Sequence, residues 1–200
     1  MSAADIEIRR LGAGDAETFR DIRLEALARN PEAFGSTFEA EKEKPLSWFS
    51  DRLGASHVHG AFHAAKLIGI AALVVQQSAK MAHKGALVSM YVRPQARRLG
   101  VGRRLVEAII DTARRHVELV QLTVVTDNEA ALRLYTGLGF VQYGLEKKAL
   151  KQGGRYYDEI LMTKDLAQRE PGRTFQHDGK RKAATDYEKS SKPSGIIMND

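Results

Sequence analysis

Two spacings of hydrophobic residues divide the chain into strand-like and helix-like segments. Runs of β-branched and aromatic residues predict seven strands, at residues 6–11, 58–63, 66–76, 84–92, 119–126, 140–150 and 156–166. Apolar residues at helical spacing predict helices at residues 15–28, 45–53, 103–113 and 130–135. Helices therefore follow the first, fourth and fifth strands. This order predicts an α/β fold with a mixed, mostly antiparallel seven-stranded sheet flanked by helices.

Turn-forming residues set the borders of these segments. Asp15 is a suitable N-cap for the first helix, and Asn30-Pro31 ends it. Arg20 and Arg23 lie three positions apart on that helix and are expected to make solvated ion pairs. Residues 34–44 are expected to form a loop. Hairpin tips are predicted at residues 64–65 and 152–154.

Composition indicates a globular domain followed by a polar tail. Hydrophobic residues make up 43% of the chain and charged residues 28%, which are ordinary globular values. We expect one domain over residues 1–166, and a flexible tail over residues 167–200, where almost no periodic apolar face occurs. No apolar run approaches the roughly 20 residues of a membrane span, and the first residues carry no signal-peptide core. A cytoplasmic location is therefore expected. The chain has no cysteine, and its six histidines have no metal-ligand spacing, so no metal site is expected.

Residues 87–116 join a strand to a helix through a short basic loop. Pro94 lacks an N–H and should end the strand pairing, and residues 97–102 then lead into the helix. The backbone N–H groups of the loop and the positive end of the helix dipole meet at one point. Gly100 and Gly102 let a ligand approach the backbone closely. The arrangement predicts an anion site, best suited to a diphosphate.

The spacing of this loop excludes two common nucleotide-binding loops. No third glycine completes G-x-G-x-x-G, and no Gly-Lys-Ser/Thr follows. The pattern R-x-x-G-x-G after V-x-P instead resembles motif A of the GNAT (Gcn5-related N-acetyltransferase) family. In that family the loop amides hold the diphosphate of acetyl-coenzyme A (acetyl-CoA), and the preceding strand pairs with its pantetheine arm. The resemblance implies that Met90, Tyr91 and Val92 line the arm. It also implies a diphosphate cradle formed by Arg97, Arg98, Leu99, Gly100, Val101, Gly102 and Arg103.

A second segment resembles motif B of the same family, N-x-x-A-x-x-x-Y-x-x-x-G-F. The matching residues are Asn128, Ala131, Tyr135, Gly139 and Phe140. Asn128 and Tyr135 are about two turns apart at about 3.6 residues per turn, so both project from one helix face. The resemblance implies that Asn128 and Ala131 bind the cofactor and that Tyr135 lies beside the thioester sulfur. A tyrosine hydroxyl there can protonate the departing thiolate as a general acid.

The general base and the acceptor contacts stay open. Many GNAT enzymes use a glutamate on the fourth strand, but here that strand reads GALVSMYV and has no carboxylate. His83 and Glu39 are alternative bases, with Glu41 a third. In enzymes of this build the region between the first two strands lines the acceptor pocket, so Phe34, Phe38 and Glu41 are candidate acceptor contacts. A charged loop that only contacts solvent is the alternative.

The two motifs together predict an N-acetyltransferase that uses acetyl-CoA as co-substrate. Direct attack by a primary amine in a ternary complex is expected, with a small-molecule amine as the first choice. A protein N-terminal or lysine acetyltransferase is the alternative, since residues 154–157 resemble the final hairpin of ribosomal-protein N-terminal acetyltransferases. A non-catalytic acyl-CoA-binding sensor or interaction module is an alternative of another class. The net charge of +6 suits anionic coenzyme A, nucleic acid is not an expected partner, and a homodimer is compatible with the sequence.

Overall fold

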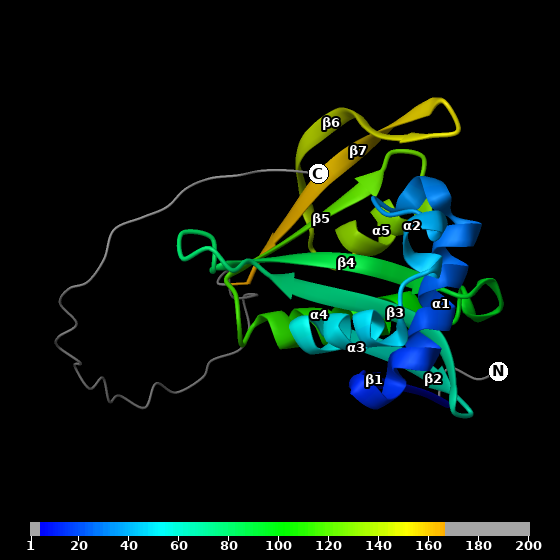
Figure 1. Cartoon of the computed structure of the whole chain (residues 1–200). Coiled ribbons are helices and arrows are strands. Elements are labelled where there is room, and N and C mark those ends of the chain that lie inside the picture. Colours follow the sequence, from blue (N-terminus) through cyan, green and yellow to red (C-terminus); the bar gives the residue numbers. More distant parts are fainter. Residues whose placement is uncertain (1–4, 167–200) are drawn as a thin grey trace, which may run out of the picture. The chain divides into compact units, whose positions relative to one another are not determined.

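Seven strands form one sheet in residues 5–166, the part of the chain that this computed structural model describes (Figure 1). The strands are β1 (Ile6–Arg10), β2 (His57–His63), β3 (Lys66–Val75), β4 (Lys84–Val92), β5 (Leu119–Val125), β6 (Val141–Gln152) and β7 (Arg155–Asp165). Their spatial order is β1-β2-β3-β4-β5-β7-β6, and every neighbouring pair is antiparallel except β4 and β5. The predicted mixed, mostly antiparallel sheet is confirmed. The tail expected at residues 167–200 lies outside the described residues.

The helices follow the expected segments with small differences at their ends, and one further helix is present. They are α1 (Ala16–Arg29), α2 (Phe38–Lys42), α3 (Leu46–Ala55), α4 (Val101–Ala113) and α5 (Glu129–Thr136). Helix α4 begins two residues earlier than expected, because Gly100 adopts a left-handed conformation at φ +75° and serves as the N-cap. Helix α2 replaces part of the expected loop. It forms because Thr37 Oγ1 accepts a hydrogen bond from the Ala40 N–H at 3.2 Å.

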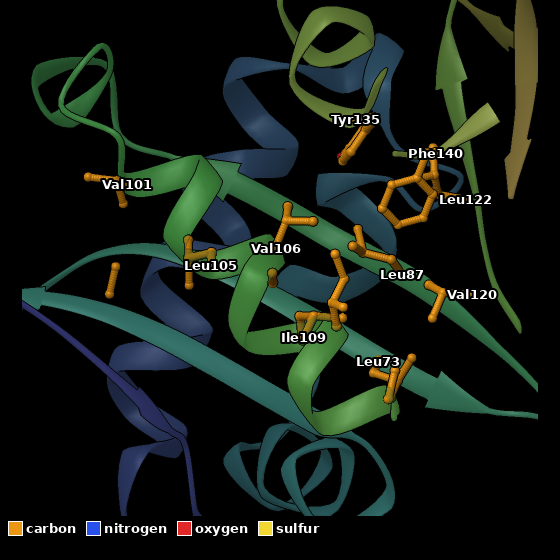
Figure 2. Packing of buried hydrophobic residues seen from close by; sticks show 14 of the residues in the cluster. Leu73, Leu87, Val101, Leu105, Val106, Ile109, Val120, Leu122, Tyr135 and Phe140 are labelled. Atoms are coloured by element: carbon orange, nitrogen blue, oxygen red, sulfur yellow. The ribbon is translucent and has the colours of Figure 1, made fainter. Parts of the chain in front are cut away.

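Helices cover the two faces of the sheet with separate hydrophobic clusters. Residues of α1 and α3 pack with Ile70 and Ala72 of β3, whereas residues of α4 and α5 pack with Ala71 and Leu73. Alternate residues of a strand point to opposite faces, so the two clusters lie on opposite sides of β3. Figure 2 shows Leu105 and other α4 residues packed toward the strands, with the rings of Tyr135 and Phe140 in the same cluster.

Strands β4 and β5 separate soon after they begin. Their parallel register covers only residues 84–86 of β4 and residues 119–121 of β5. Further along, β4 carries a bulge, in which Ser89 and Met90 face the single residue Ala71 of β3 and Ser89 has φ +55°. A bulge bends its strand and increases the local twist, which turns β4 away from β5. The two strands diverge in Figure 1, and the second half of β4 has no strand partner on its β5 side in the described sheet.

A buried ion pair holds α2 against α1. Arg23 donates from Nε and Nη2 to the two carboxylate oxygens of Glu41, at 3.0 and 2.7 Å, and both side chains are at most 5% exposed. The expectation of a solvated ion pair at Arg23 is therefore wrong. Burial alone would raise the pKa of Glu41, but its hydrogen bonds with Arg23 and Ser36 and the Arg23 charge lower that pKa below its usual value. Glu41 therefore stays ionised at neutral pH. Its contribution to the free energy of unfolding is present above the pKa of an ordinary glutamate and is lost as the pH falls through the lowered pKa of Glu41.

We expect Glu41→Ala to lower the free energy of unfolding by about 3–5 kcal/mol, because Arg23 would stay buried without its partner. Urea denaturation measures this change. Glu43→Ala, at an exposed position of the same segment, is the matched control. Replacing both partners with apolar residues, as Arg23→Met with Glu41→Leu, should restore most of the lost stability. Equal unfolding midpoints for the Glu41 and Glu43 single variants would contradict the assigned ion pair.

Candidate active site

Two adjoining cavities lie where β4 and β5 have separated. The outer cavity, of about 990 Å³, is bounded by the loop before α4, the end of β4 and helix α5. The inner cavity, of about 200 Å³, is bounded by the β4 bulge, β5, β7 and residues 33–35. The residues that line both are Ala33, Phe34, Met90, Val125, Asn128, Ala131 and Tyr135. The two cavities therefore meet around Tyr135.

The start of α4 presents free backbone N–H groups to the outer cavity. The helical hydrogen bond from the Arg104 N–H to the Gly100 carbonyl leaves the N–H groups of Val101, Gly102 and Arg103 without an acceptor inside the helix. All three residues line the outer cavity. These N–H groups and the helix dipole favour an anion at this end of the cavity.

Arginine side chains add positive charge around the same end of the cavity. Arg97, Arg98 and Arg103 line it, and Arg97 Nε donates to the Val92 carbonyl at 3.0 Å, which ties the loop to the end of β4. Arg155 of β7 lines the outer cavity as well and pairs with Asp127 at 2.9 Å. The predicted cofactor residues other than Leu99 all line this cavity, and Leu99 packs against the hydrophobic core instead. The amides, the charge and the volume fit a coenzyme A diphosphate and its arm.

The end of β4 is fixed to α1 by a polar cluster. The Tyr91 hydroxyl donates to Glu25 Oε1 at 3.0 Å, and Arg93 Nε donates to Glu25 Oε2 at 2.9 Å. Arg93 also donates from Nη1 to the Leu67 carbonyl at 2.9 Å. Burial and the neighbouring Glu25 carboxylate raise the pKa of Tyr91 to about 12, so its hydroxyl remains a donor. This cluster holds the backbone of β4 in place at the rim of the outer cavity.

Tyr135 is positioned by the short helix α5. Asn128 Oδ1 caps that helix by accepting from the Ala131 N–H at 3.1 Å. The Tyr135 ring packs edge-on against Phe140, with 5.8 Å between ring centroids, and the residue is 5% exposed (Figure 2). Burial raises the pKa of Tyr135 above its ordinary value, so the phenol is protonated at neutral pH. A protonated hydroxyl at the junction of the two cavities is able to donate a proton to a leaving group there.

The inner cavity contains polar residues that sequence reasoning missed. Ser89, Thr123 and Glu159 line it, and Thr123 Oγ1 donates to Glu159 Oε1 at 3.0 Å. Burial raises the pKa of Glu159, the hydrogen bond from Thr123 lowers it, and the charge of Glu146 raises it, with a net increase. No local sequence signal marks Glu159, because only the pairing of β5 with β7 brings it beside Thr123.

Several predicted site residues lie elsewhere. His83 and Glu39 line neither cavity. The backbone carbonyl of His83 accepts hydrogen bonds from residues 118 and 119 at the closed end of the β4–β5 pair, roughly 23 Å along β4 from Met90. The structure therefore does not support either residue as the base. Phe34 lines both cavities as expected of an acceptor contact, whereas Phe38 lines neither.

Glu41 is the remaining candidate from the loop after α1. Its carboxylate is held by Arg23 in the buried ion pair, and the residue lines neither cavity. The structure thus corrects its expected role, because neither oxygen is open to an acceptor. Its position instead fixes α2 next to the segment that carries Phe34.

The chain belongs to the acetyltransferase (GNAT) family, whose model matches residues 19–140. It is therefore a GNAT N-acetyltransferase with acetyl-CoA as co-substrate. The chain is 32% identical over 130 residues to the N-alpha-acetyltransferase RimI of Mycobacterium tuberculosis H37Rv, covering 64% of this chain and 79% of that protein. It is 25% identical over 166 residues to the L-amino acid N-acetyltransferase AaaT of Escherichia coli K12, covering 80% of this chain and 98% of that protein.

Solved structures share the fold. A GNAT-family acetyltransferase from Streptococcus pneumoniae superposes with a TM-score of 0.72 at 23% identity, covering 80% of this chain and 98% of that chain. YncA of Salmonella typhimurium, solved with its cofactor acetyl-CoA, also gives a TM-score of 0.72, at 22% identity over 84% of this chain and 98% of that chain. At these identities the likeness confirms the predicted fold.

Two further features of residues 5–166 bear on partners. None of the helices described there is long and apolar enough to cross a membrane. No cluster of three or more His, Cys, Asp or Glu side chains suited to a metal ion occurs in the same part of the chain.

We expect Gly102→Glu to abolish acetyl-CoA binding, because a negative side chain would face the anion site. A Cβ at this position already approaches Met90 Cε to 3.2 Å. Calorimetric titration with acetyl-CoA measures the loss. Gly54→Glu in α3, where a Cβ meets no atom within 4 Å, is the control for an added surface charge. Wild-type affinity in a folded Gly102→Glu variant would show that the diphosphate binds elsewhere.

Proposed function

We propose that this enzyme acetylates a small primary amine, which enters the inner cavity and attacks the thioester of acetyl-CoA held in the outer cavity. The observation that carries the proposal is the junction of the two cavities at Tyr135. One cavity suits a large anionic donor and the other suits a small acceptor, and a hydroxyl able to donate a proton lies between them.

The residues around the junction have separable roles in this reaction. Bound acetyl-CoA supplies the acetyl group as a thioester. The N–H groups of Val101, Gly102 and Arg103 hold the diphosphate, and the free backbone edge of β4 orients the arm. A backbone N–H near Val92 stabilises the negative charge that develops on the carbonyl oxygen. Tyr135 donates its hydroxyl proton to the departing sulfur.

The size of the inner cavity supports a small amine or the first residue of a longer one. About 200 Å³ leaves space for a compact side chain around the reacting nitrogen. Two relatives differ in acceptor, since RimI is an N-alpha-acetyltransferase and AaaT acts on L-amino acids. A protein N-terminus is therefore the second candidate acceptor. A small free amine is the first candidate acceptor.

A screen of amines with acetyl-CoA tests the proposed reaction. Free amino acids, amino acid amides, polyamines and short peptides with a free N-terminus are each incubated with the full chain, and thiol release is followed. Turnover of compact amines above that of peptides supports the proposal. Turnover of peptides alone would assign the second acceptor class. Tight acetyl-CoA binding without thiol release for any amine would contradict the enzymatic assignment and favour an acyl-CoA sensor.

We expect Tyr135→Phe to lower kcat by more than about tenfold while acetyl-CoA affinity changes little, because only the hydroxyl is removed. Thiol release and calorimetry measure the two quantities. Tyr156→Phe is the matched control, since Tyr156 is exposed on β7 and lines neither cavity. An unchanged kcat in Tyr135→Phe would remove the hydroxyl from the acid role and leave the rest of the site intact.

A further inference from the structure

Strand β4 carries no carboxylate, and Glu159 is the only one among the described residues that line the inner cavity. It lies on β7 and lines the inner cavity together with Ser89, Thr123 and Tyr135. We propose that Glu159 is the catalytic residue that binds the acceptor ammonium and removes its proton. This inference rests on the proposed acetyl transfer and assigns the step that the sequence left open.

The strand register directs Glu159 into the inner cavity. In the antiparallel pair of β5 and β7, Thr123 faces Leu161 and Val125 faces Glu159. Thr123, Val125 and Glu159 therefore project from the same face of the sheet. Thr123 Oγ1 donates to Glu159 Oε1 at 3.0 Å, which orients the carboxylate. Tyr135 lines the same cavity from α5, so an amine there has a carboxylate and a phenol on its walls.

The charges around the inner cavity favour a cation. Among the described residues that line it, Glu159 is the only Asp or Glu, and none is Lys or Arg. Arg23 does not line the inner cavity, but its Nη1 donates to Ser89 Oγ at 3.4 Å. Its Nε and Nη2 donate to the Glu41 carboxylate. The other charged groups on the two strands beside Glu159 are Glu146, Lys147, Lys148 and Lys151 on β6 and Arg155, Asp158, Lys164 and Asp165 on β7. Lys147 pairs with Asp158 at 3.7 Å and Arg155 with Asp127 at 2.9 Å. Glu32 and the phenols of Tyr135 and Tyr157 line the outer cavity, and Tyr135 lines the inner cavity as well.

Glu159 is also a better proton acceptor than an exposed glutamate. Burial raises its pKa, and Glu146, directly opposite on β6, raises it further, whereas the Thr123 hydrogen bond opposes both. An alkyl ammonium has a pKa near 10 and is almost wholly protonated at neutral pH, so it cannot attack until a base removes a proton. A carboxylate with a raised pKa accepts that proton more readily.

The protons of this reaction balance with Glu159 as the base and Tyr135 as the acid. Glu159 takes one proton from the ammonium, and the nitrogen lone pair forms the new C–N bond as the C–S bond breaks. Tyr135 gives its proton to the sulfur, and the second proton lost by the nitrogen restores Tyr135. Glu159 returns its proton to solvent. The overall reaction thus releases one proton for each ammonium that becomes an amide.

The charge of Glu159 in the inner cavity leads to a prediction of which amines the enzyme accepts. A carboxylate attached next to the amine would lie close to Glu159, with no described Lys or Arg in the inner cavity to pair with it. Repulsion between the two carboxylates would oppose binding of such an amine. L-Alaninamide should therefore be acetylated with a higher kcat/KM than L-alanine. The two values are compared per concentration of neutral amine, because the ammonium of L-alaninamide has the lower pKa, about 8.

The deciding experiment compares Glu159→Gln with the wild-type chain on L-alaninamide, and on the amine of highest turnover in the screen. Glutamine keeps the shape and a hydrogen-bond partner for Thr123 but accepts no proton. We expect kcat/KM on L-alaninamide to fall by at least about tenfold at pH 7, where about a tenth of that amine is already neutral, with acetyl-CoA affinity unchanged by calorimetry. The loss should shrink at high pH, where the free amine is already neutral.

Substitutions of two neighbouring residues, Glu146 and Thr123, should shift the pH dependence of kcat/KM. A purely structural role of Glu159 would leave that pH dependence unchanged. Glu146→Gln removes a charge that raises the pKa of Glu159, so the acid limb of the kcat/KM profile should move to lower pH. Thr123→Val removes the hydrogen bond that lowers the pKa of Glu159, so the acid limb of the kcat/KM profile should move to higher pH.

The outcomes separate this inference from the proposed function. Wild-type turnover with an equally active Glu159→Gln variant, or acid limbs that stay in place in both neighbour variants, would overturn the role of Glu159 and leave the acetyltransferase intact. A preference for L-alanine over L-alaninamide would also overturn it. Acetyl-CoA binding with no turnover by the wild-type chain would instead reject the proposed function itself.

Discussion

The separation of β4 from β5 is the constraint on which the whole site depends. Parallel pairing ends after Ala86, and the bulge at Ser89 and Met90 turns β4 away. A sheet normally satisfies its backbone groups through neighbouring strands, so an unpaired edge in the middle of a sheet needs another partner. A ligand with its own amide groups is suited to that edge. The unusual φ of +55° at Ser89 is a local strain that the surrounding packing of α1 must hold.

Opposite charges are kept on the two sides of this opening. The outer cavity is lined by four arginines, helix N–H groups and two acidic residues, Glu32 and Asp127, whereas the inner cavity is lined by one described carboxylate and no described Lys or Arg. This difference is what the proposed reaction requires, with an anionic donor on one side of Tyr135 and an ammonium acceptor on the other. Because the Tyr135 ring is buried among apolar side chains, its phenolate is disfavoured and the hydroxyl stays protonated at neutral pH, which keeps a proton beside the position of the sulfur in the proposed reaction.

The sequence predicted those parts of the site that are local in the chain. The loop ending at Gly102 and the helix carrying Asn128 and Tyr135 are continuous segments, and their residue spacing alone gives their geometry. Leu99 belongs to the same loop, but its apolar side chain packs against the core and does not line the outer cavity. The strand and hairpin predictions succeeded for the same reason, since alternation and turn residues are also local.

Non-local pairing explains the parts that were missed. Arg23 and Glu41 are each unremarkable in their own segments, and only the approach of α2 to α1 buries them together. His83 and Glu39 were favoured by closeness in sequence to the strand or the acceptor segment, but the fold directs both away from the cavities. A carboxylate from β7 could not be assigned without knowing that β7 inserts between β5 and β6.

The pairing of β6 with β7 gives a physical reason to regard Glu159 as more than a surface residue. Glu146 lies directly opposite it across the two strands, and like charges in such pairs destabilise a sheet. A different strand register would separate the two glutamates, but a shift of one residue would also turn Glu159 to the other face of the sheet. The pair raises the pKa of the glutamate that lines the inner cavity, and a raised pKa suits the base that we propose for an ammonium substrate.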